Sequence, residues 1–222
     1  MARPSAGSRT TPVPEEAGAV EHLRAADPLM ADLIERFGHP EEVRAARGRR
    51  PGDAYGALVR AIVGQQLSTK AARSIFDRLV EHFGGHTPTP SQLLAADPEE
   101  MRAAAGLSRA KVSFLRDLAE HVEDGDLPID QLAELPDEEV AERLTAIKGL
   151  GPWTLHMFLI FHLGRPDVLP VGDLGIRKAV QVLHGLDELP TPAELERIAE
   201  PWRPHRSLAS LYLWRSLDNQ PA

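Results

Sequence analysis

The sequence predicts an all-α fold, and three observations support this prediction. Alanine, leucine, arginine and glutamate are frequent, and these residue types favour helices. Apolar residues recur at helical spacing, as they do at Ile176, Ala179, Val180 and Leu183. No stretch alternates apolar and polar residues in the way a half-buried strand does. Turn-forming residues separate the periodic segments, so we expect about ten short helices and no sheet.

The expected elements can be placed along the chain. Residues 1–18 are rich in Ala, Ser, Thr, Pro and Gly, which predicts a disordered tail. The apolar positions between residues 57 and 84 suit one or two helices. Proline or aspartate followed by acidic residues marks the start of further helices. These starts are Asp27-Pro28, Asp97-Pro98-Glu99-Glu100 and Pro136-Asp137-Glu138-Glu139.

The composition excludes several classes of protein. The chain of 222 residues has no cysteine, and therefore no disulfide, no thiol nucleophile and no cysteine-bound iron–sulfur cluster. No apolar run reaches the ~18 residues of a membrane-spanning helix, and no secretory signal opens the chain. We therefore expect a cytoplasmic protein, associated with the nucleoid if the host is a prokaryote. The net charge of −8 argues against a nucleic-acid partner, but basic residues gather in stretches of their own and leave room for a local basic face.

A glycine turn, Gly149-Leu150-Gly151, lies between two helical patterns. Pro152 follows it and suits the first position of a new helix. The glycines leave backbone N–H groups uncovered at a helix N-terminus, where the partial positive charge attracts an anion. The turn can therefore bind a phosphate without a basic side chain. Taken alone, it can equally be an ordinary connection between two helices.

Motifs on both sides of the turn extend this interpretation. The turn segment LTAIKGLGPWTLHMF is preceded by ALVRAIVGQQLSTKAARSIFDRLVEHFG and followed by LPVGDLGIRKAV. Together they resemble the helix-hairpin-helix base-excision DNA glycosylases. The segment WRPHRSLASLYLWR resembles the 3-methyladenine DNA glycosylase II branch, in its compact form without an N-terminal sheet domain. The resemblance implies two helical lobes with a cleft between them, one spanning residues 53–169 and the other combining residues 19–52 with 170–222.

The resemblance also implies an activity. It indicates a monofunctional DNA glycosylase that hydrolyses the N-glycosidic bond of alkylated purines, such as 3-methyladenine and 7-methylguanine, in double-stranded DNA. Asp173 is then the catalytic carboxylate, which stabilises the positive charge developing on the sugar. The alternative for Asp173 is a helix N-cap, and one residue can serve as both. Members that also cut the backbone carry a lysine where this chain has Trp153, and Lys148 lies on the other side of the turn, so no lyase activity is expected.

Aromatic side chains are expected to shape the base pocket. Trp153 can stack on an electron-poor base. Met157 lies one helical turn later and faces the same side of the helix. Trp214 matches the second aromatic of the pocket in related enzymes. For Trp153 and Trp214 the alternative is packing in the core.

The resemblance also places the DNA contacts. A flipped base leaves a gap in the duplex, and the side chains expected at this gap are Gln65, Gln66, Leu67 and Ser68. Of these, Gln66 is the expected plug, and an exposed helix end is the alternative. Phosphate contacts are expected at the hairpin and at a second turn, through Gly149, Gly151, Thr154, Gly106 and Lys111. For the second turn the alternative is an ordinary surface helix.

One cation and several partners follow from the same resemblance. The family hairpin binds a monovalent cation, sodium or potassium, through backbone carbonyls, which are here those of Thr145, Ile147 and Leu150. No cofactor is expected for catalysis, and the nine histidines show no transition-metal pattern. We expect a monomer whose partner is double-stranded DNA containing alkylated bases, with no membrane contact. The alternatives are a glycosylase for oxidised or mismatched bases, a non-catalytic DNA-binding module and a protein-interaction scaffold. The lesion range, including ethenoadenine and hypoxanthine, stays open.

Overall fold

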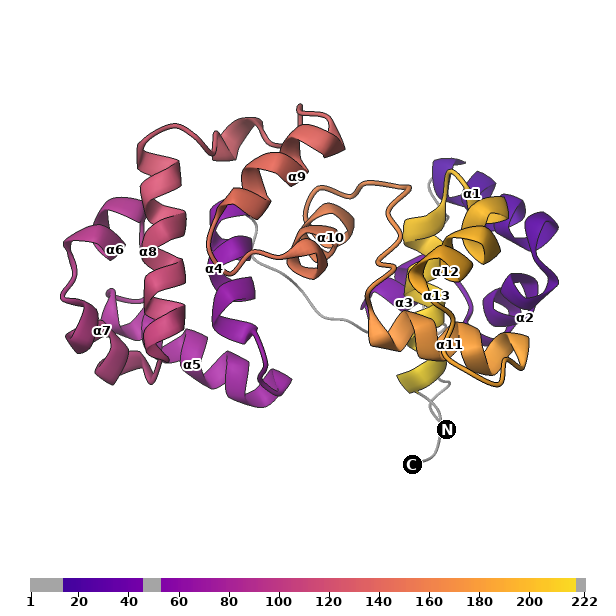
Figure 1. Ribbon diagram of the computed structural model, residues 1–222, viewed down its shortest axis with the longest axis horizontal. Helices are drawn as coiled ribbons and strands as arrows, with labels where there is room; N and C mark the ends of the chain where they lie inside the picture. The colour runs from indigo at the N-terminus through magenta and orange to yellow at the C-terminus, as the bar shows by residue number, and fades with distance from the viewer. Residues whose placement is uncertain (1–13, 46–52, 219–222) are drawn as a thin grey trace, which may run out of the picture. The chain divides into compact units, whose positions relative to one another are not determined.

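A computed structural model describes residues 14–45 and 53–218 (Figure 1). Within these residues every regular element is a helix and no strand occurs, which confirms the predicted all-α class. The α-helices run from α1 to α13, more than the roughly ten expected, because segments as short as one or two turns are helical. None of the described helices is long and apolar enough to cross a lipid bilayer.

The chain forms two compact units, and each contains its own core. Among the described residues, unit 1 consists of residues 14–45 and 173–218, and unit 2 consists of residues 53–172. The chain therefore returns to unit 1 at Asp173, whereas the sequence analysis placed this return at residue 170. Residues 46–52, at the end of the predicted 19–52 segment, lie outside the described residues.

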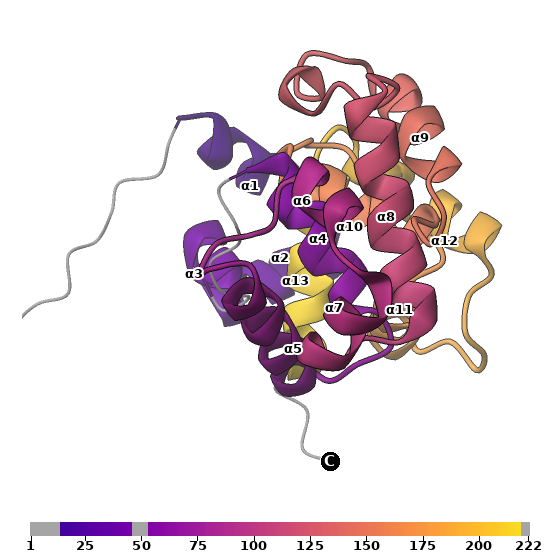
Figure 2. The same ribbon diagram turned by 90° about the vertical axis from the view of Figure 1, so that its left-hand side faces the viewer.

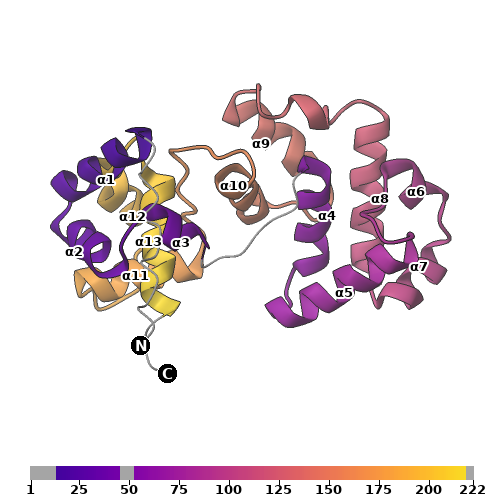
Figure 3. The same cartoon turned by 180° about the vertical axis from the view of Figure 1, so that it is seen from behind.

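Unit 1 is built around α13, whose apolar residues are buried on most of its circumference. Leu208, Leu211, Tyr212 and Leu213 are all at most 5 % exposed, as expected for a helix surrounded by others. Helix α13 packs against α2, α3 and α11, and α1 packs against α2 and η2 (Figure 3). The elements of unit 1 are α1 (Pro14–Ala26), α2 (Pro28–Phe37), α3 (Pro40–Ala45), α11 (Leu174–His184), α12 (Pro192–Ala199), η2 (Glu200–Trp202) and α13 (Arg206–Asp218).

Unit 2 is arranged around α4 and α8. Helix α8 packs against α4, α6 and α7, and α4 also packs against α5 and α10 (Figure 2). Leu58, Val59 and Ile62 of α4 are completely buried. The elements of unit 2 are α4 (Ala54–Gly64), α5 (Thr69–His82), α6 (Pro90–Ala95), α7 (Pro98–Ala105), α8 (Arg109–Glu123), η1 (Ile129–Gln131), α9 (Asp137–Ala146) and α10 (Pro152–Phe161).

The helix starts follow the capping signals in the sequence. The Asp27 side chain accepts a hydrogen bond from the Leu29 amide at 2.8 Å. The Asp97 side chain accepts from the amides of Glu99 and Glu100. Helix α9 begins at Asp137 as expected, although its cap residue Pro136 makes no side-chain bond. Capping side chains satisfy N–H groups that have no partner within the first helical turn.

Two expectations about the N-terminal half are refined or corrected. The region between residues 57 and 84 contains two helices, α4 and α5, because the chain turns at residues 65–68. The predicted disordered tail is wrong for residues 14–18, which belong to α1. Proline suits a first helical turn, and α1 is held by burial of Ala19 and Leu23 in unit 1, at 7 % and 0 % exposure. Residues 1–13 of that tail lie outside the described part of the chain.

Candidate functional site

Asp173 is the N-cap of α11, and two donors orient its carboxylate. The backbone is extended there, and Oδ1 accepts a hydrogen bond from the Ile176 amide at 2.9 Å. The same Oδ1 accepts from the indole Nε1–H of Trp214, also at 2.9 Å. The residue is only 9 % exposed. The cap alternative therefore holds, and it gives the carboxylate the fixed direction that electrostatic catalysis needs.

Trp214 contributes a hydrogen bond that the sequence analysis did not foresee. Its side chain is 6 % exposed, so it is enclosed within unit 1. Its indole reaches Asp173 because α13 packs directly against α11. Trp214 therefore does pack in the core, which was the alternative to a place in the base pocket. In addition, its indole N–H orients the carboxylate of Asp173.

Gly175 makes room for this pair, and it is not among the site residues predicted from the sequence. A Cβ atom at this position would lie 3.0 Å from Oδ1 of Asp173 and 3.3 Å from Cδ1 of Trp214. An alanine would therefore press on both the carboxylate and the indole. The available signal was a glycine two residues after the acid, in the segment Asp173-Leu174-Gly175.

The hairpin between α9 and α10 has the backbone that a glycine turn requires. Gly149 has a φ of 82°, and a Cβ there would lie 2.3 Å from Cδ2 of Phe114. Leu150 donates its amide to the Ile147 carbonyl at 3.1 Å and buries its side chain. Within the part of the chain that the structure describes, the amides of Gly149 and Gly151 have no hydrogen-bond acceptor. They lie at the N-terminus of α10, so they can bind an anion.

Thr154 and Trp153 occupy the first turn of α10 with opposite exposures. Thr154 is 6 % exposed, so a phosphate contact from it falls to its backbone N–H rather than to its hydroxyl. Trp153 is 52 % exposed, which excludes simple core packing as its explanation. Met157, one turn later, is 8 % exposed and belongs mostly to the interior of unit 2. The exposed ring of Trp153 is therefore the more accessible of the two predicted pocket residues on α10.

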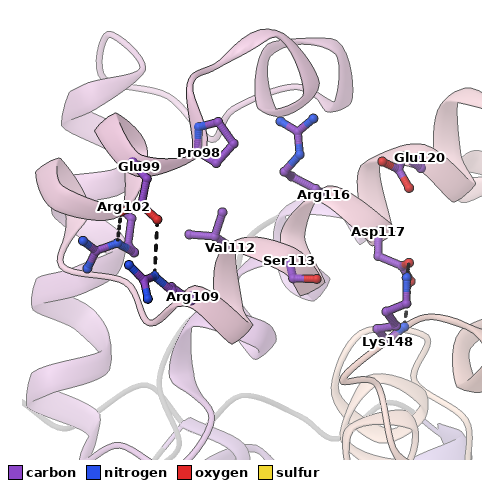
Figure 4. A pocket seen from close by; sticks show the side chains of 10 residues that line it. All are labelled: Pro98, Glu99, Arg102, Arg109, Val112, Ser113, Arg116, Asp117, Glu120 and Lys148. Atoms are coloured by element: carbon purple, nitrogen blue, oxygen red, sulfur yellow. Dashed lines mark hydrogen bonds and ion pairs between the residues drawn. The ribbon is translucent and has the colours of Figure 1, made fainter.

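Lys148 is bound to a buried carboxylate on α8. Its Nζ lies 2.6 Å from Oδ1 of Asp117, and its amide donates to Oδ2 at 2.8 Å (Figure 4). Burial raises the pKa of Asp117, but the bonds and charge of Lys148 outweigh it and leave this pKa below its usual value. The hydrogen bond to Asp117 and the charge of that carboxylate raise the pKa of Lys148. A protonated amine that is hydrogen-bonded to a carboxylate is a poor nucleophile. This agrees with the expectation that Lys148 forms no Schiff base.

The four residues predicted at the DNA gap divide into two pairs. Gln65 does not project from the turn, because its Nε2 donates to the Gly149 carbonyl at 2.6 Å. Ser68 is the N-cap of α5, and its Oγ accepts from the Ala71 amide at 3.3 Å. Gln66 is exposed, with a left-handed φ of 58°, and Leu67 is 37 % exposed. Gln66 and Leu67 are therefore the protruding pair.

The second predicted phosphate turn differs from expectation. Gly106 is the C-cap of α7, and its amide donates to the Arg102 carbonyl at 2.9 Å, so this amide is not available to a phosphate. The Nζ of Lys111 donates to the carbonyls of Val63 and Gln65, at 2.8 and 2.9 Å. Burial lowers the pKa of Lys111. Both residues satisfy helix ends within unit 2, which sequence spacing does not reveal.

The carbonyls predicted to hold a cation lie at the end of α9 and in the turn. Those of Thr145, Ile147 and Leu150 are neutral, hard oxygen donors, a set that suits sodium or potassium better than a transition metal. Among residues 14–45 and 53–218, no three His, Asp or Glu side chains are grouped to bind a metal. The donor chemistry therefore fits the expected monovalent ion.

A hollow of about 370 Å³ opens between α7 and α8 in unit 2 (Figure 4). None of the predicted site residues lines it. Most of its charged side chains are already engaged: Glu99 bonds Arg102 at 2.7 Å and Arg109 at 3.4 Å, Asp117 bonds Lys148, and Arg116 donates to backbone carbonyls. The hollow is therefore no candidate for the site of chemistry.

Comparison with known proteins decides the family. Residues 59–204 match the model of the HhH-GPD superfamily base excision DNA repair proteins, a region that includes the hairpin and Asp173. The chain belongs to this superfamily. The resemblance found in the sequence is thus confirmed, and the hairpin and the acid both lie within the matched residues. Trp214 lies beyond the matched residues, so its bond to Asp173 is a feature that the structure adds.

Individual HhH-GPD relatives agree with this assignment. DNA-3-methyladenine glycosylase 1 of Schizosaccharomyces pombe is 39 % identical over 88 % of this chain and 85 % of its own length. The solved structure of the 3-methyladenine DNA glycosylase Mag1 from that yeast, in complex with abasic DNA, superposes with a TM-score of 0.80 at 37 % identity and covers 90 % of this chain and 97 % of that one. A DNA-3-methyladenine glycosidase from Bacillus halodurans gives a TM-score of 0.77 at 36 % identity, over 90 % of this chain and 89 % of that one.

Proposed function

We propose that this protein is a monofunctional DNA glycosylase that hydrolyses the N-glycosidic bond of alkylated purines in double-stranded DNA. The observation that carries the proposal is the carboxylate of Asp173, oriented by the Ile176 amide and the Trp214 indole, in a chain of this superfamily. The names of its relatives support 3-methyladenine as a substrate. We include 7-methylguanine because alkylation at either nitrogen makes the purine cationic.

The chemistry requires little more than a well-placed negative charge. A purine alkylated at N3 or N7 is already cationic and leaves readily without strong acid assistance. The difficult part is the positive charge that develops on the sugar as the bond breaks. The Asp173 carboxylate stabilises this charge and orients the attacking water. Its bonds to Ile176 and Trp214 remove the need to reorganise it during the reaction.

Those predicted residues that the structure leaves available bind the DNA. The amides of Gly149 and Gly151 hold a backbone phosphate at the N-terminus of α10. A monovalent cation on the carbonyls of Thr145, Ile147 and Leu150 would add positive charge beside that phosphate. Gln66, with Leu67 beside it, fills the gap that the flipped nucleotide leaves. The exposed ring of Trp153 stacks on the cationic base.

The decisive experiment measures base release from methylated duplex DNA by the native protein and by Asp173→Asn. Asparagine keeps an oxygen for the Ile176 amide and is a good N-cap, so the variant should fold while losing the charge. We expect methylpurine release by the native protein, its loss in Asp173→Asn, and strand breaks only after alkali. The matched control is Asp187→Asn, which removes an exposed carboxylate from the same unit and should release bases normally.

Three outcomes would contradict parts of the proposal. Breaks without alkali would indicate a lyase. Release of an oxidised base instead of methylpurines would change the substrate class. Binding of damaged DNA without release of any base would leave a non-catalytic DNA-binding module.

A further inference from the structure

One helix, α8, touches both turns to which the proposed function assigns DNA contacts. Lys111, Phe114 and Asp117 follow one another at every third position and so form an inclined row along this helix. Lys111 bonds the carbonyls that end α4, immediately before Gln66. The Phe114 ring lies against Gly149, and Asp117 bonds Lys148 at the start of the hairpin turn. Helix α8 stands beside α4 in unit 2 (Figure 1).

A direct bond joins the two turns to each other. The Nε2 of Gln65 donates to the Gly149 carbonyl at 2.6 Å. Gln65 also offers its own carbonyl to Lys111, at 2.9 Å. Lys111, Gln65 and Gly149 are therefore consecutive members of one chain of hydrogen bonds that runs from α8 through the turn at residues 65–68 to the hairpin.

The turn held by Lys111 is strained and has few other supports. Gln66 has a φ of 58°, a left-handed backbone conformation that residues other than glycine rarely adopt. The carbonyls at the end of α4 lack partners within the helix. The ammonium of Lys111 satisfies two of them and complements the negative end of the helix dipole. The backbone bonds donated by residues of the turn are long, at 3.4 Å for Gln65 N to Ile62 O and 3.3 Å for Leu67 N to Gly64 O.

We propose that Lys111 is a positioning residue, which holds Gln66 and Leu67 in register with the hairpin amides of Gly149 and Gly151. This inference rests on the proposed function for its effect on catalysis. It replaces the phosphate contact that the sequence suggested for Lys111, since two of the three ammonium hydrogens are committed to carbonyls. Insertion of Gln66 into the gap and binding of the phosphate by the hairpin are then coupled, because the turn at residues 65–68 is hydrogen-bonded to the hairpin before DNA binds.

The test compares Lys111→Met, which keeps the length of the side chain without its donors, with Lys111→Arg, which keeps donors and charge. Arg109→Met is the matched control for loss of a positive charge, because Arg109 lies on the same helix with 83 % of its side chain exposed. Two quantities are measured on methylated duplex: the rate of base release at saturating protein, and the dependence of binding on salt. A 2-aminopurine opposite the lesion reports whether the gap is filled.

A positioning role predicts a specific combination of results. In Lys111→Met, base release should slow by about tenfold or more, because hydrogen bonds from a charged donor are lost. The 2-aminopurine signal should show poorer filling of the gap, and the slope of log K against log salt should match that of the native protein. Lys111→Arg should recover most of the rate, and Arg109→Met should stay within about twofold of native. If the salt dependence of binding by Lys111→Met were less steep than that of the native protein by about 0.9, with an unchanged rate of base release, Lys111 would be a phosphate ligand. This result would overturn the proposal.

A second readout does not depend on activity. Hydrogen exchange of the free protein should show faster exchange at residues 65–68 in Lys111→Met than in the native protein or in Lys111→Arg, with α11 unchanged. Unchanged hydrogen exchange at residues 65–68 would refute the positioning role of Lys111, even if base release became slower. If the native protein releases no methylpurine, the proposed function fails, and the exchange experiment still decides whether Lys111 holds the turn.

Discussion

Substitution of Gly149 by alanine should destabilise unit 2 far more than the loss of a hydrogen atom suggests. The new Cβ would lie 2.3 Å from Cδ2 and 2.6 Å from Cγ of Phe114, so the ring or the turn must move. Overpacking of this kind typically costs about 1–3 kcal/mol. The φ of 82° adds roughly 1–2 kcal/mol for a residue with a side chain. The expected loss is therefore roughly 2–5 kcal/mol.

The matched control lies two residues away. Gly151 has a φ of −89°, and a Cβ there would meet nothing within 4 Å, so Gly151→Ala should change stability by about 1 kcal/mol or less. Thermal unfolding followed by circular dichroism measures both variants. For a chain of this size, each kcal/mol shifts the midpoint by about 2–4 °C, so Gly149→Ala should unfold roughly 4–20 °C below native.

A double variant identifies the cause of the loss. Phe114→Ala removes the ring that the new methyl group meets, so in the Phe114→Ala background the change Gly149→Ala should cost mainly the strain of the left-handed backbone. The effects of the two substitutions should therefore be strongly non-additive. A clash between the new methyl group and Phe114 is ruled out if Gly149→Ala unfolds at the same temperature as Gly151→Ala, or if the costs of Gly149→Ala and Phe114→Ala simply add.

Two further predictions concern the carboxylates. Trp214→Phe keeps an aromatic ring but removes the donor to Oδ1 of Asp173, so single-turnover base release should fall by about tenfold or more while the fold is retained; a native rate would show that the indole does not position the acid. Lys148 holds the pKa of Asp117 below its usual value despite burial, so the pair contributes stability above the ordinary aspartate pKa of about 4 and loses it as pH falls through the lower folded-state pKa. Urea unfolding should show Asp117→Asn clearly less stable than native at pH 7, with a smaller difference at pH 3; a difference that grows on acidification would contradict this assignment.

Much of the architecture was readable from the sequence because it depends on neighbouring residues. Helix periodicity and cap residues act within one or two turns of chain, so Asp27, Asp97 and the start of α9 were predicted in place. The glycine turn before Pro152 and the N-cap at Asp173 are local in the same sense. Composition gave a wrong prediction at residues 14–18, because α1 packs against η2, a distant segment of the chain.

The roles of several site residues were decided by tertiary structure alone. Trp214 meets Asp173 across 41 residues, Lys111 meets Val63 across 48, and Gln65 meets Gly149 across 84. The family resemblance predicted DNA contacts for Lys111 and Gln65, and nothing in their local sequence shows that both side chains bond within the protein. A hydrogen bond depends on where two backbones approach each other, and packing of α8 against α4 and of α13 against α11 sets that approach. Most helices, the turns and the family resemblance could be predicted because they follow from short-range patterns, whereas only the folded chain decides which donor reaches which acceptor.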